Sequence, residues 1–87
     1  MERVHVFISG EVQGIGFRGF VRRKAKQIGV NGWVKNLEDG RVEAVFEGWK
    51  IEQILEECKK GPPFCVVDKV EIIKENVKGE KDFEIRY

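Results

Sequence analysis

The stretch from Gly10 to Phe20, GEVQGIGFRGF, holds the residues of this sequence whose types and spacing could do chemistry. Residues 14–19 spell G-x-G-x-x-G, the letters of a dinucleotide-binding fingerprint. Residues 16–21, GFRGFV, resemble a motif of RNA-binding sheets. Glycines also let a backbone form a concave nest whose N–H groups converge on an anion. The stretch therefore allows a nucleotide loop, an RNA platform, a phosphate-binding turn, or a tight turn with no ligand.

The elements on either side of the glycines narrow this choice. The apolar run from Val4 to Ile8 predicts a β-strand, buried on both faces. An amphipathic helix is predicted by apolar residues at helical spacing, namely Phe17, Phe20, Val21, Ala25 and Ile28. Gly29 follows as a natural helix stop. The glycine stretch thus joins the end of a strand to the start of a helix.

A helix start carries unpaired N–H groups and the positive end of the helix dipole. Arg18 adds a planar fork of donors that matches phosphate oxygens. We therefore expect an oxyanion of phosphate size to be the natural occupant of this loop.

The rest of the chain completes a regular pattern of elements. Strands are predicted at 32–36 and 42–47, with Asp39-Gly40 as the turn between them. A second amphipathic helix follows from Ile51 to Cys58 and stops at Gly61-Pro62-Pro63, and further strands are predicted at 66–73 and 83–87. The order β-α-β-β-α-β with a short C-terminal strand predicts an α+β, ferredoxin-like split βαβ fold. We expect one domain over residues 1–87, with two helices on one face of a mostly antiparallel sheet.

This context argues against three readings of the glycines. A doubly wound dinucleotide domain needs two βαβαβ halves, and no acidic residue stands about twenty positions on, where Val34 is found. No Gly-Lys-Ser/Thr of a P-loop follows the glycines. An RNA platform would need Phe17 and Phe20 in mid-strand, but their spacing is helical, which makes them core residues. A non-catalytic module that senses anions or binds RNA is the alternative that stays open.

The composition of the chain does not demand a macromolecular partner. The net charge is +1 with 36% charged residues, so no nucleic-acid partner is expected. No apolar run approaches the roughly 20 residues of a membrane span, and no signal peptide is present, so we expect no membrane contact and a cytoplasmic monomer. Cys58 and Cys65 are expected to be reduced, the first on a helix and the second in a loop.

Other conspicuous side chains receive structural interpretations. We expect the lone histidine, His5, to be a hydrogen-bonded or edge residue rather than a catalyst. Core or sheet-face positions are expected for the aromatic residues Trp33, Phe46, Phe83 and Tyr87. The basic face of the first helix could steer an anionic substrate; its residues are Arg22, Arg23, Lys24 and Lys26.

The combination of segments resembles the acylphosphatase family. Residues 10–18, G-E-V-Q-G-I-G-F-R, are similar to the first signature of that family. Residues 32–36, G-W-V-K-N, look like the second signature, together with Asp39, Gly40, Val42, Glu43 and Gly48. Gly61-Pro62 and the segment 83–87 are similar as well, so the resemblance covers nearly the whole chain in order.

The resemblance implies hydrolysis of acyl phosphates, which are carboxyl-phosphate anhydrides, to a carboxylate and inorganic phosphate without a metal or cofactor. Arg18 matches the phosphate-binding arginine of the family, and Asn36 matches the asparagine that positions the attacking water. The backbone cradle corresponds to the loop of Gln13, Gly14, Ile15, Gly16, Phe17 and Arg18. Phosphate and sulfate are then expected to be competitive anions.

Four positions depart from the family pattern. Ile15 stands where valine is usual, and Gly19 is unusually flexible for a helix start. Leu37 and Arg41 stand where many relatives carry Ser or Thr, which leaves open whether a hydroxyl supports Asn36. None of these departures falls on Arg18 or Asn36, the two residues expected to carry the chemistry.

Overall fold

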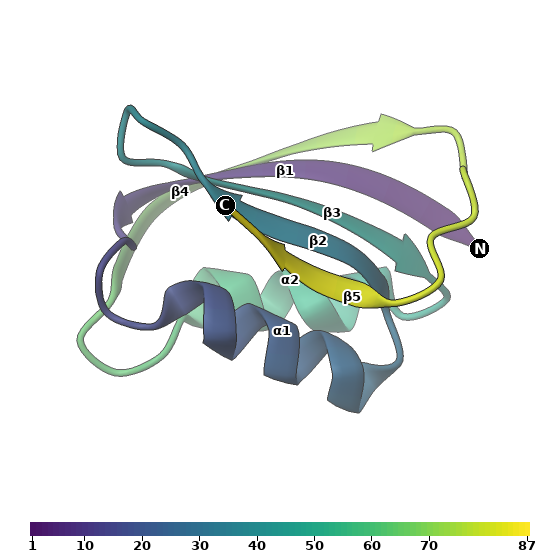
Figure 1. The fold of residues 1–87 in the computed structure, drawn as a ribbon, viewed down its shortest axis with the longest axis horizontal. Coiled ribbons are helices and arrows are strands. Elements are labelled where there is room, and N and C mark those ends of the chain that lie inside the picture. Colours follow the sequence, from purple (N-terminus) through teal and green to yellow (C-terminus); the bar gives the residue numbers. More distant parts are fainter.

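The helices and strands follow one another in the order predicted from the sequence, β-α-β-β-α-β with a short C-terminal strand (Figure 1). The computed structural model describes residues 1–87. The elements are β1 (Glu2–Glu11), α1 (Phe17–Ile28), β2 (Asn31–Asn36), β3 (Val42–Gly48), α2 (Ile51–Lys60), β4 (Val66–Glu75) and β5 (Phe83–Arg86). The two helices form a layer against one face of a single sheet. The expected α+β, ferredoxin-like split βαβ fold is confirmed.

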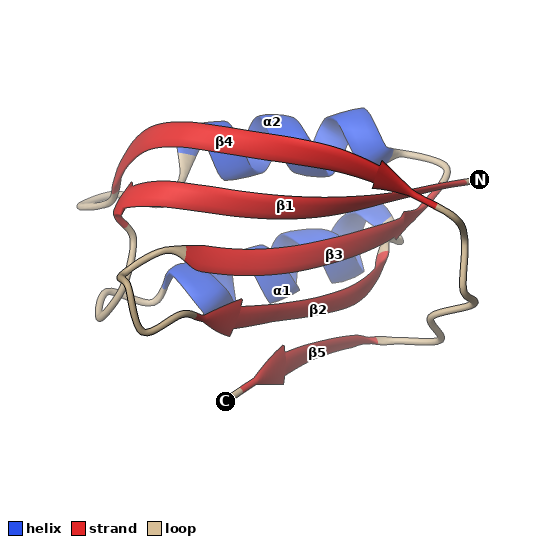
Figure 2. Ribbon diagram, turned by 90° about the horizontal axis from the view of Figure 1, so that it is seen from above, coloured by secondary structure: helices blue, strands red, loops and turns tan.

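The topology of the sheet brings the C-terminal ends of three strands to the same end of the sheet. The strand order is β4-β1-β3-β2-β5, and every pair is antiparallel except β2 with β5 (Figure 2). Because β1 and β2 are both antiparallel to β3, they run in the same direction, as does β5. The C-terminal ends of β1, β2 and β5 therefore meet at one end of the molecule.

Both helices are held to the sheet by the apolar stripes expected from the sequence. The buried residues of α1 are Phe17, Phe20, Val21 and Ala25, and those of α2 are Ile51, Ile54 and Cys58. Gly29 ends α1 in the left-handed conformation, φ 91°, and its N–H donates to the carbonyl of Ala25. This is the conformation that glycine adopts without strain. Burial of these faces against the sheet forms one core of 17 residues.

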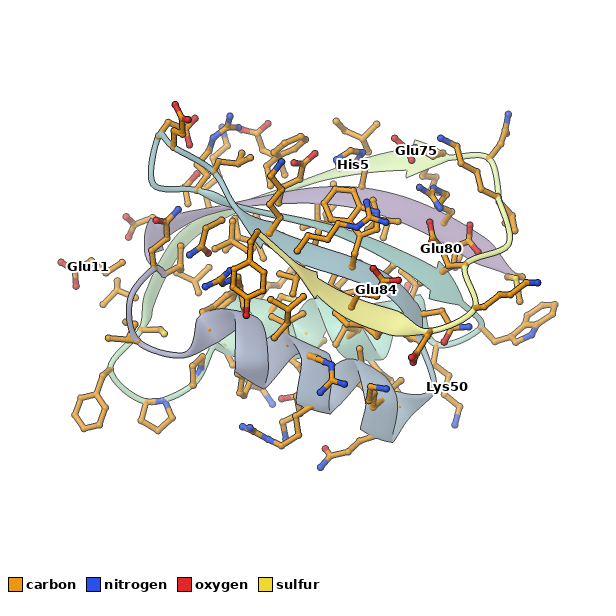
Figure 3. All side chains as sticks on the ribbon, in the orientation of Figure 1. His5, Glu11, Lys50, Glu75, Glu80 and Glu84 are labelled. Carbon is orange, nitrogen blue, oxygen red and sulfur yellow. The ribbon has the colours of Figure 1, made fainter.

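The prediction that the first strand is buried on both faces is wrong. Val4, Val6 and Ile8 are buried, whereas His5 and Phe7 lie on the opposite, partly exposed face. Helices cover only one face of the sheet, so alternate residues of β1 face solvent. Figure 3 shows His5 on this open face, on the side of the sheet away from the helices.

His5 is hydrogen-bonded, as expected, although it lies on a central strand rather than at an edge. Its Nδ1 lies 2.9 Å from a carboxylate oxygen of Glu75, and its Nε2 lies 2.5 Å from one of Glu43. Phe46 and Phe83 are core residues, and Trp33 is on the open face beside His5. The remaining aromatic residue, Tyr87, is not a core residue, because 93% of its surface is exposed.

The two cysteines are both free. Cys58 is buried in the core on α2, and Cys65 is partly buried in the loop before β4. Burial raises the pKa of the Cys58 thiol to about 12. Cys58 is therefore a small core residue. Neither helix is long and apolar enough to cross a membrane.

Candidate active site

The loop between β1 and α1 exposes a row of backbone donors. Gly14 and Gly16 adopt left-handed conformations, with φ of 82° and 83°, and Gly16 is the N-cap of α1. No N–H group of residues 14–19 donates a hydrogen bond to the protein, and no acidic side chain lies in the first turn of the helix. These free donors add to the positive end of the helix dipole, so the loop is suited to an anion.

The side chain of Gln13 ties this loop to the turn between β2 and β3. Its Nε2 donates to the carbonyl oxygens of Leu37, at 2.7 Å, and Arg41, at 2.8 Å. Within that turn the Asp39 carboxylate accepts from the N–H of Arg41 at 3.1 Å, which confirms Asp39 as a turn residue. Gln13 therefore fixes the distance between the loop and the end of β2.

Asn36 occupies the end of β2 that faces the loop. It alternates with the buried residues Gly32 and Val34, so its side chain lies on the helix-covered face of the sheet. Its Oδ1 atom is buried and has no hydrogen-bond partner. A buried acceptor without a partner is unfavourable and is normally satisfied by water or a ligand. The amide is thus ready to accept a hydrogen bond from a small molecule in the space before it.

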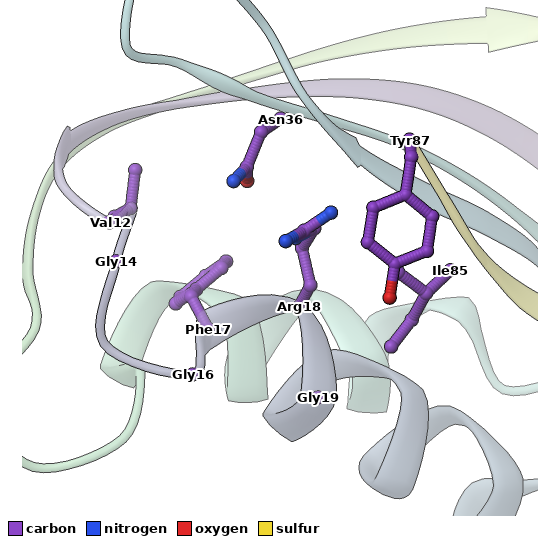
Figure 4. A pocket seen from close by; sticks show the side chains of 9 residues that line it. All are labelled: Val12, Gly14, Gly16, Phe17, Arg18, Gly19, Asn36, Ile85 and Tyr87. Atoms are coloured by element: carbon purple, nitrogen blue, oxygen red, sulfur yellow. The ribbon is translucent and has the colours of Figure 1, made fainter.

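Arg18 reaches into the same space from the first turn of α1. Figure 4 shows its guanidinium between the helix and the Asn36 amide, with the Tyr87 ring beside it. Its Nη1 donates to the carbonyl oxygen of Arg86 at 3.3 Å, and its Cζ lies 4.8 Å from the centre of the Tyr87 ring. Residues from the opposite end of the chain therefore orient Arg18.

These groups enclose a pocket of about 210 Å³. Its lining residues are Val12, Gly14, Gly16, Phe17, Arg18, Gly19, Asn36, Ile85 and Tyr87 (Figure 4). Of the site residues expected from the sequence, five line the pocket and two do not. Gln13 turns its side chain toward the β2–β3 turn, and Ile15 is 42% exposed. Both can take part in the loop only through their backbone.

Sequence reasoning missed four lining residues: Val12, Gly19, Ile85 and Tyr87. Ile85 and Tyr87 could have been found from the alternation of buried and exposed residues along β5. Phe83 is buried in the core, so Ile85 and Tyr87, two and four positions on, share its face and point toward α1. That face of β5 leads directly to the pocket.

The pocket is electrostatically positive. It is lined by Arg18 and by loop residues whose N–H groups make no hydrogen bond within the protein, and no Asp or Glu residue lines it. No group of three or more His, Cys, Asp or Glu side chains in the structure is arranged to hold a metal ion. Fold and site together define a ferredoxin-like protein with an anion pocket at the strand-to-helix loop.

Comparison with known proteins agrees with this description. A sequence model of the acylphosphatase family matches residues 4–85. The acylphosphatase of Trichormus variabilis is 49% identical over 86 residues, covering 97% of this chain and 85% of that protein. The crystal structure of acylphosphatase from Bacillus subtilis superposes with a TM-score of 0.97 at 37% identity, covering all of both chains. That of an acylphosphatase from Coxiella burnetii gives 0.93 at 40% identity, covering 98% and 92% of the two chains.

The chain belongs to the acylphosphatase family. It is a hydrolase that acts on acid anhydrides, and the activity supported for it is hydrolysis of acyl phosphates.

Proposed function

We propose that the chain hydrolyses acyl phosphates without a metal ion or cofactor, with distinct roles for the two sides of the pocket. The loop of residues 13–18 and Arg18 hold the phosphate group. Asn36 positions the water that attacks it. The observation that carries this proposal is the buried, unpartnered Oδ1 of Asn36, which shares a pocket with Arg18 and the free N–H groups.

Phosphate binding is supported by the donors that converge on the pocket. Gly14 and Gly16 are left-handed and line the pocket at the helix start, and successive N–H groups in such a turn can form a nest that binds an anion. Arg18 adds a guanidinium, which binds phosphate oxygens in a bidentate manner. An acyl phosphate would thus place its negatively charged oxygens against the loop and the guanidinium.

Water positioning is supported by the chemistry of the Asn36 amide. Its Oδ1 can accept one hydrogen of a water molecule, and this leaves a lone pair of the water oxygen free for attack on phosphorus. The amide does not ionise, so it orients the water without acting as a base. Holding the water near the phosphorus converts a bimolecular encounter into a positioned reaction.

The reaction then balances with groups that the site and substrate supply. The water oxygen forms a bond to phosphorus as the bond from phosphorus to the carboxyl oxygen breaks. The electron pair of that bond leaves with the carboxylate, and one water proton passes to a phosphate oxygen. The products are a carboxylate and dihydrogen phosphate. The carboxylate is a good leaving group, so no general acid is required.

Arg18 and the N–H groups would stabilise the negative charge on the phosphoryl oxygens during this step. Phosphoryl transfer depends mainly on positioning and on such stabilisation, which in many enzymes comes from bound cations. The fixed donors of the pocket can fill that role, and this is why we propose that no metal ion is needed.

Hydrolysis of benzoyl phosphate in excess chelator tests the proposal. We expect the wild-type protein to hydrolyse it well above the spontaneous rate, with inorganic phosphate as a competitive inhibitor. Arg18→Ala should lower kcat/KM by about 10²–10³ and weaken inhibition by phosphate. Lys60→Ala, which removes an exposed cation from α2 that lines neither this pocket nor the surface beside it, is the control and should keep most of the activity.

Two results would contradict the proposal. Activity that disappears with the chelator and returns with a divalent cation would overturn metal independence. Absence of hydrolysis by the wild-type protein, with single-stranded RNA or phosphate still bound, would favour the non-catalytic alternatives.

A further inference from the structure

A second and larger hollow adjoins the phosphate pocket on the outer side of α1. It measures about 540 Å³ and is lined by Gly19, Arg22, Arg23, Lys26, Gln27 and Ile85. Gly19 and Ile85 also line the phosphate pocket, so the two spaces are adjacent and meet at these two residues. We call the larger one the basic groove. A substrate bound by its phosphate at Arg18 could extend into this groove.

Gly19 keeps the passage between the two spaces open. It lies in the first turn of α1 and does not adopt a positive φ, and a Cβ atom placed there would meet nothing within 4 Å. Neither backbone conformation nor packing against the protein therefore requires glycine at this position. Glycine is also among the least favourable residues for a helix. The structural effect of Gly19 is to leave free space beside Arg18, where any other residue would place a side chain.

Arg22 supplies a positive charge that the fold does not use. It follows Arg18 by four residues, so the two arginines share a face of α1 and are separated by about 6 Å along its axis. Arg22 makes no hydrogen bond and no ion pair with the protein, although it is near enough to Asp82 to help lower the pKa of that carboxyl.

The next residue on this face of α1, Lys26, already forms an ion pair within the protein. Its Nζ lies 2.9 Å from the Asp82 carboxylate, and this pair marks the far end of the basic groove. Asp82 would repel an anion placed beyond Arg22. The free cation nearest to the phosphate pocket along the groove is therefore Arg22, and the chain of a ligand between the two arginines would lie over Gly19 and against Ile85.

We propose that the basic groove is the subsite for the acyl group and that it selects acyl phosphates whose acyl chain ends in a second oxyanion, in the simplest case a carboxylate. The methylene groups of the chain pack against Ile85 and over Gly19, and Arg22 binds the terminal carboxylate. This inference rests on the proposed function, because it places the phosphate group of the substrate at Arg18.

Glutaryl phosphate and pentanoyl phosphate form a matched pair for the test, since both have five-carbon chains and only the first ends in a carboxylate. The quantity to measure is the ratio of their kcat/KM values. We expect this ratio to fall about threefold to fivefold in Arg22→Gln, the range of an exposed ion pair. Lys60→Gln removes an exposed cation from α2 that does not line the groove, and it should keep the wild-type ratio.

The outcomes separate the subsite from the activity itself. A wild-type protein that hydrolyses neither of these substrates nor benzoyl phosphate would overturn the proposed function. Hydrolysis of both substrates with the same ratio in wild type and Arg22→Gln would overturn only the subsite. An equal fall in Lys60→Gln would also overturn it, because the effect would then reflect overall charge.

Gly19→Leu tests the passage independently of charge. The leucine side chain would fill the space between the pocket and the groove, so the ratio of kcat/KM for pentanoyl phosphate to that for acetyl phosphate should fall. The thermal midpoint should stay at or above the wild-type value, because leucine is the better helix former. An unchanged ratio in this folded variant would show that acyl chains do not cross Gly19.

Discussion

The guanidinium of Arg18 is stacked on the ring of Tyr87, with 4.8 Å between its Cζ and the ring centre. The same guanidinium donates to the carbonyl oxygen of Arg86, so a side chain near the start of the sequence is oriented by residues 68 and 69 positions later. The parallel pairing of β5 with β2 makes this possible, because it places Tyr87 and Asn36 at the same end of two neighbouring strands. Arg18 is thus partly preorganised before any anion binds.

Removal of the Tyr87 ring should weaken anion binding. We expect Tyr87→Ala to raise the inhibition constant of inorganic phosphate about twofold to fivefold, the range of an exposed cation–π contact. Tyr87→Phe keeps the aromatic ring and should bind phosphate nearly as well as the wild type. Equal inhibition constants for the alanine variant and the wild type would show that stacking does not orient Arg18.

Gln13 should matter for both stability and rate, although its side chain lies outside the pocket. Gln13→Ala removes one of the two donors to each of the carbonyl oxygens of Leu37 and Arg41, which keep the backbone N–H groups of Gly40 and Leu37; the free energy of unfolding should fall by about 0.5–1.5 kcal/mol. The value of kcat should fall as well, because the loop is no longer tied to the turn that follows Asn36. Urea unfolding and the kinetics of benzoyl phosphate hydrolysis measure the two effects.

A matched control for this prediction is Gln53→Ala on the exposed face of α2, where the side chain makes no hydrogen bond. Its unfolding free energy and kcat should stay close to the wild-type values. If Gln13→Ala behaves in the same way, the hydrogen bonds to the turn contribute nothing measurable.

The buried carboxylate of Glu47 should make stability depend on pH in the acid range. Burial acts to raise the pKa of Glu47, but the N–H groups of residues 78–80 and the Arg3 guanidinium outweigh it and hold the pKa at about 2, below its ordinary 4.5. The charged form therefore stabilises the fold above pH 4.5. This contribution is lost as the pH falls from 4.5 toward 2.

Thermal midpoints measured between pH 6 and pH 2 test this prediction. The wild-type midpoint should fall steeply below pH 4.5, and the fall should be shallower in Glu47→Gln, which cannot titrate. The glutamine variant should also be less stable at neutral pH, because Arg3 loses a buried ionic partner. Parallel pH profiles for the two proteins would place the acid sensitivity elsewhere, for example at Glu75, whose pKa is lowered chiefly by its hydrogen bond from Arg3.

The fold could be predicted because its helices are marked by local signals. Phe17, Phe20, Val21 and Ala25 recur at helical spacing, and the helix face they form is the face that the structure buries. Arg18 and Asn36 could be predicted as site residues because their segments resemble family motifs. The structure brings both to one pocket, and the kinetic experiments test their roles.

Prediction from the sequence failed for features that depend on contacts between residues far apart in the chain. A run such as Val4–Ile8 does not reveal that both helices will cover the same face of the sheet, which leaves His5 and Phe7 on the open side. The part played by Tyr87 depends on the parallel pairing of β5 with β2, a contact between strands about fifty residues apart in sequence. The network around Glu47 likewise joins β3 to the segment before β5, and no local pattern predicts it.

The most direct test of the account is the kcat of Asn36→Ala with benzoyl phosphate, measured together with the inhibition constant of inorganic phosphate. If Asn36 holds the attacking water, kcat should fall about 10²–10³-fold. The inhibition constant should stay near the wild-type value, because Arg18 and the loop still bind the phosphate group. A folded Asn36→Ala protein with the wild-type kcat would contradict the proposed mechanism.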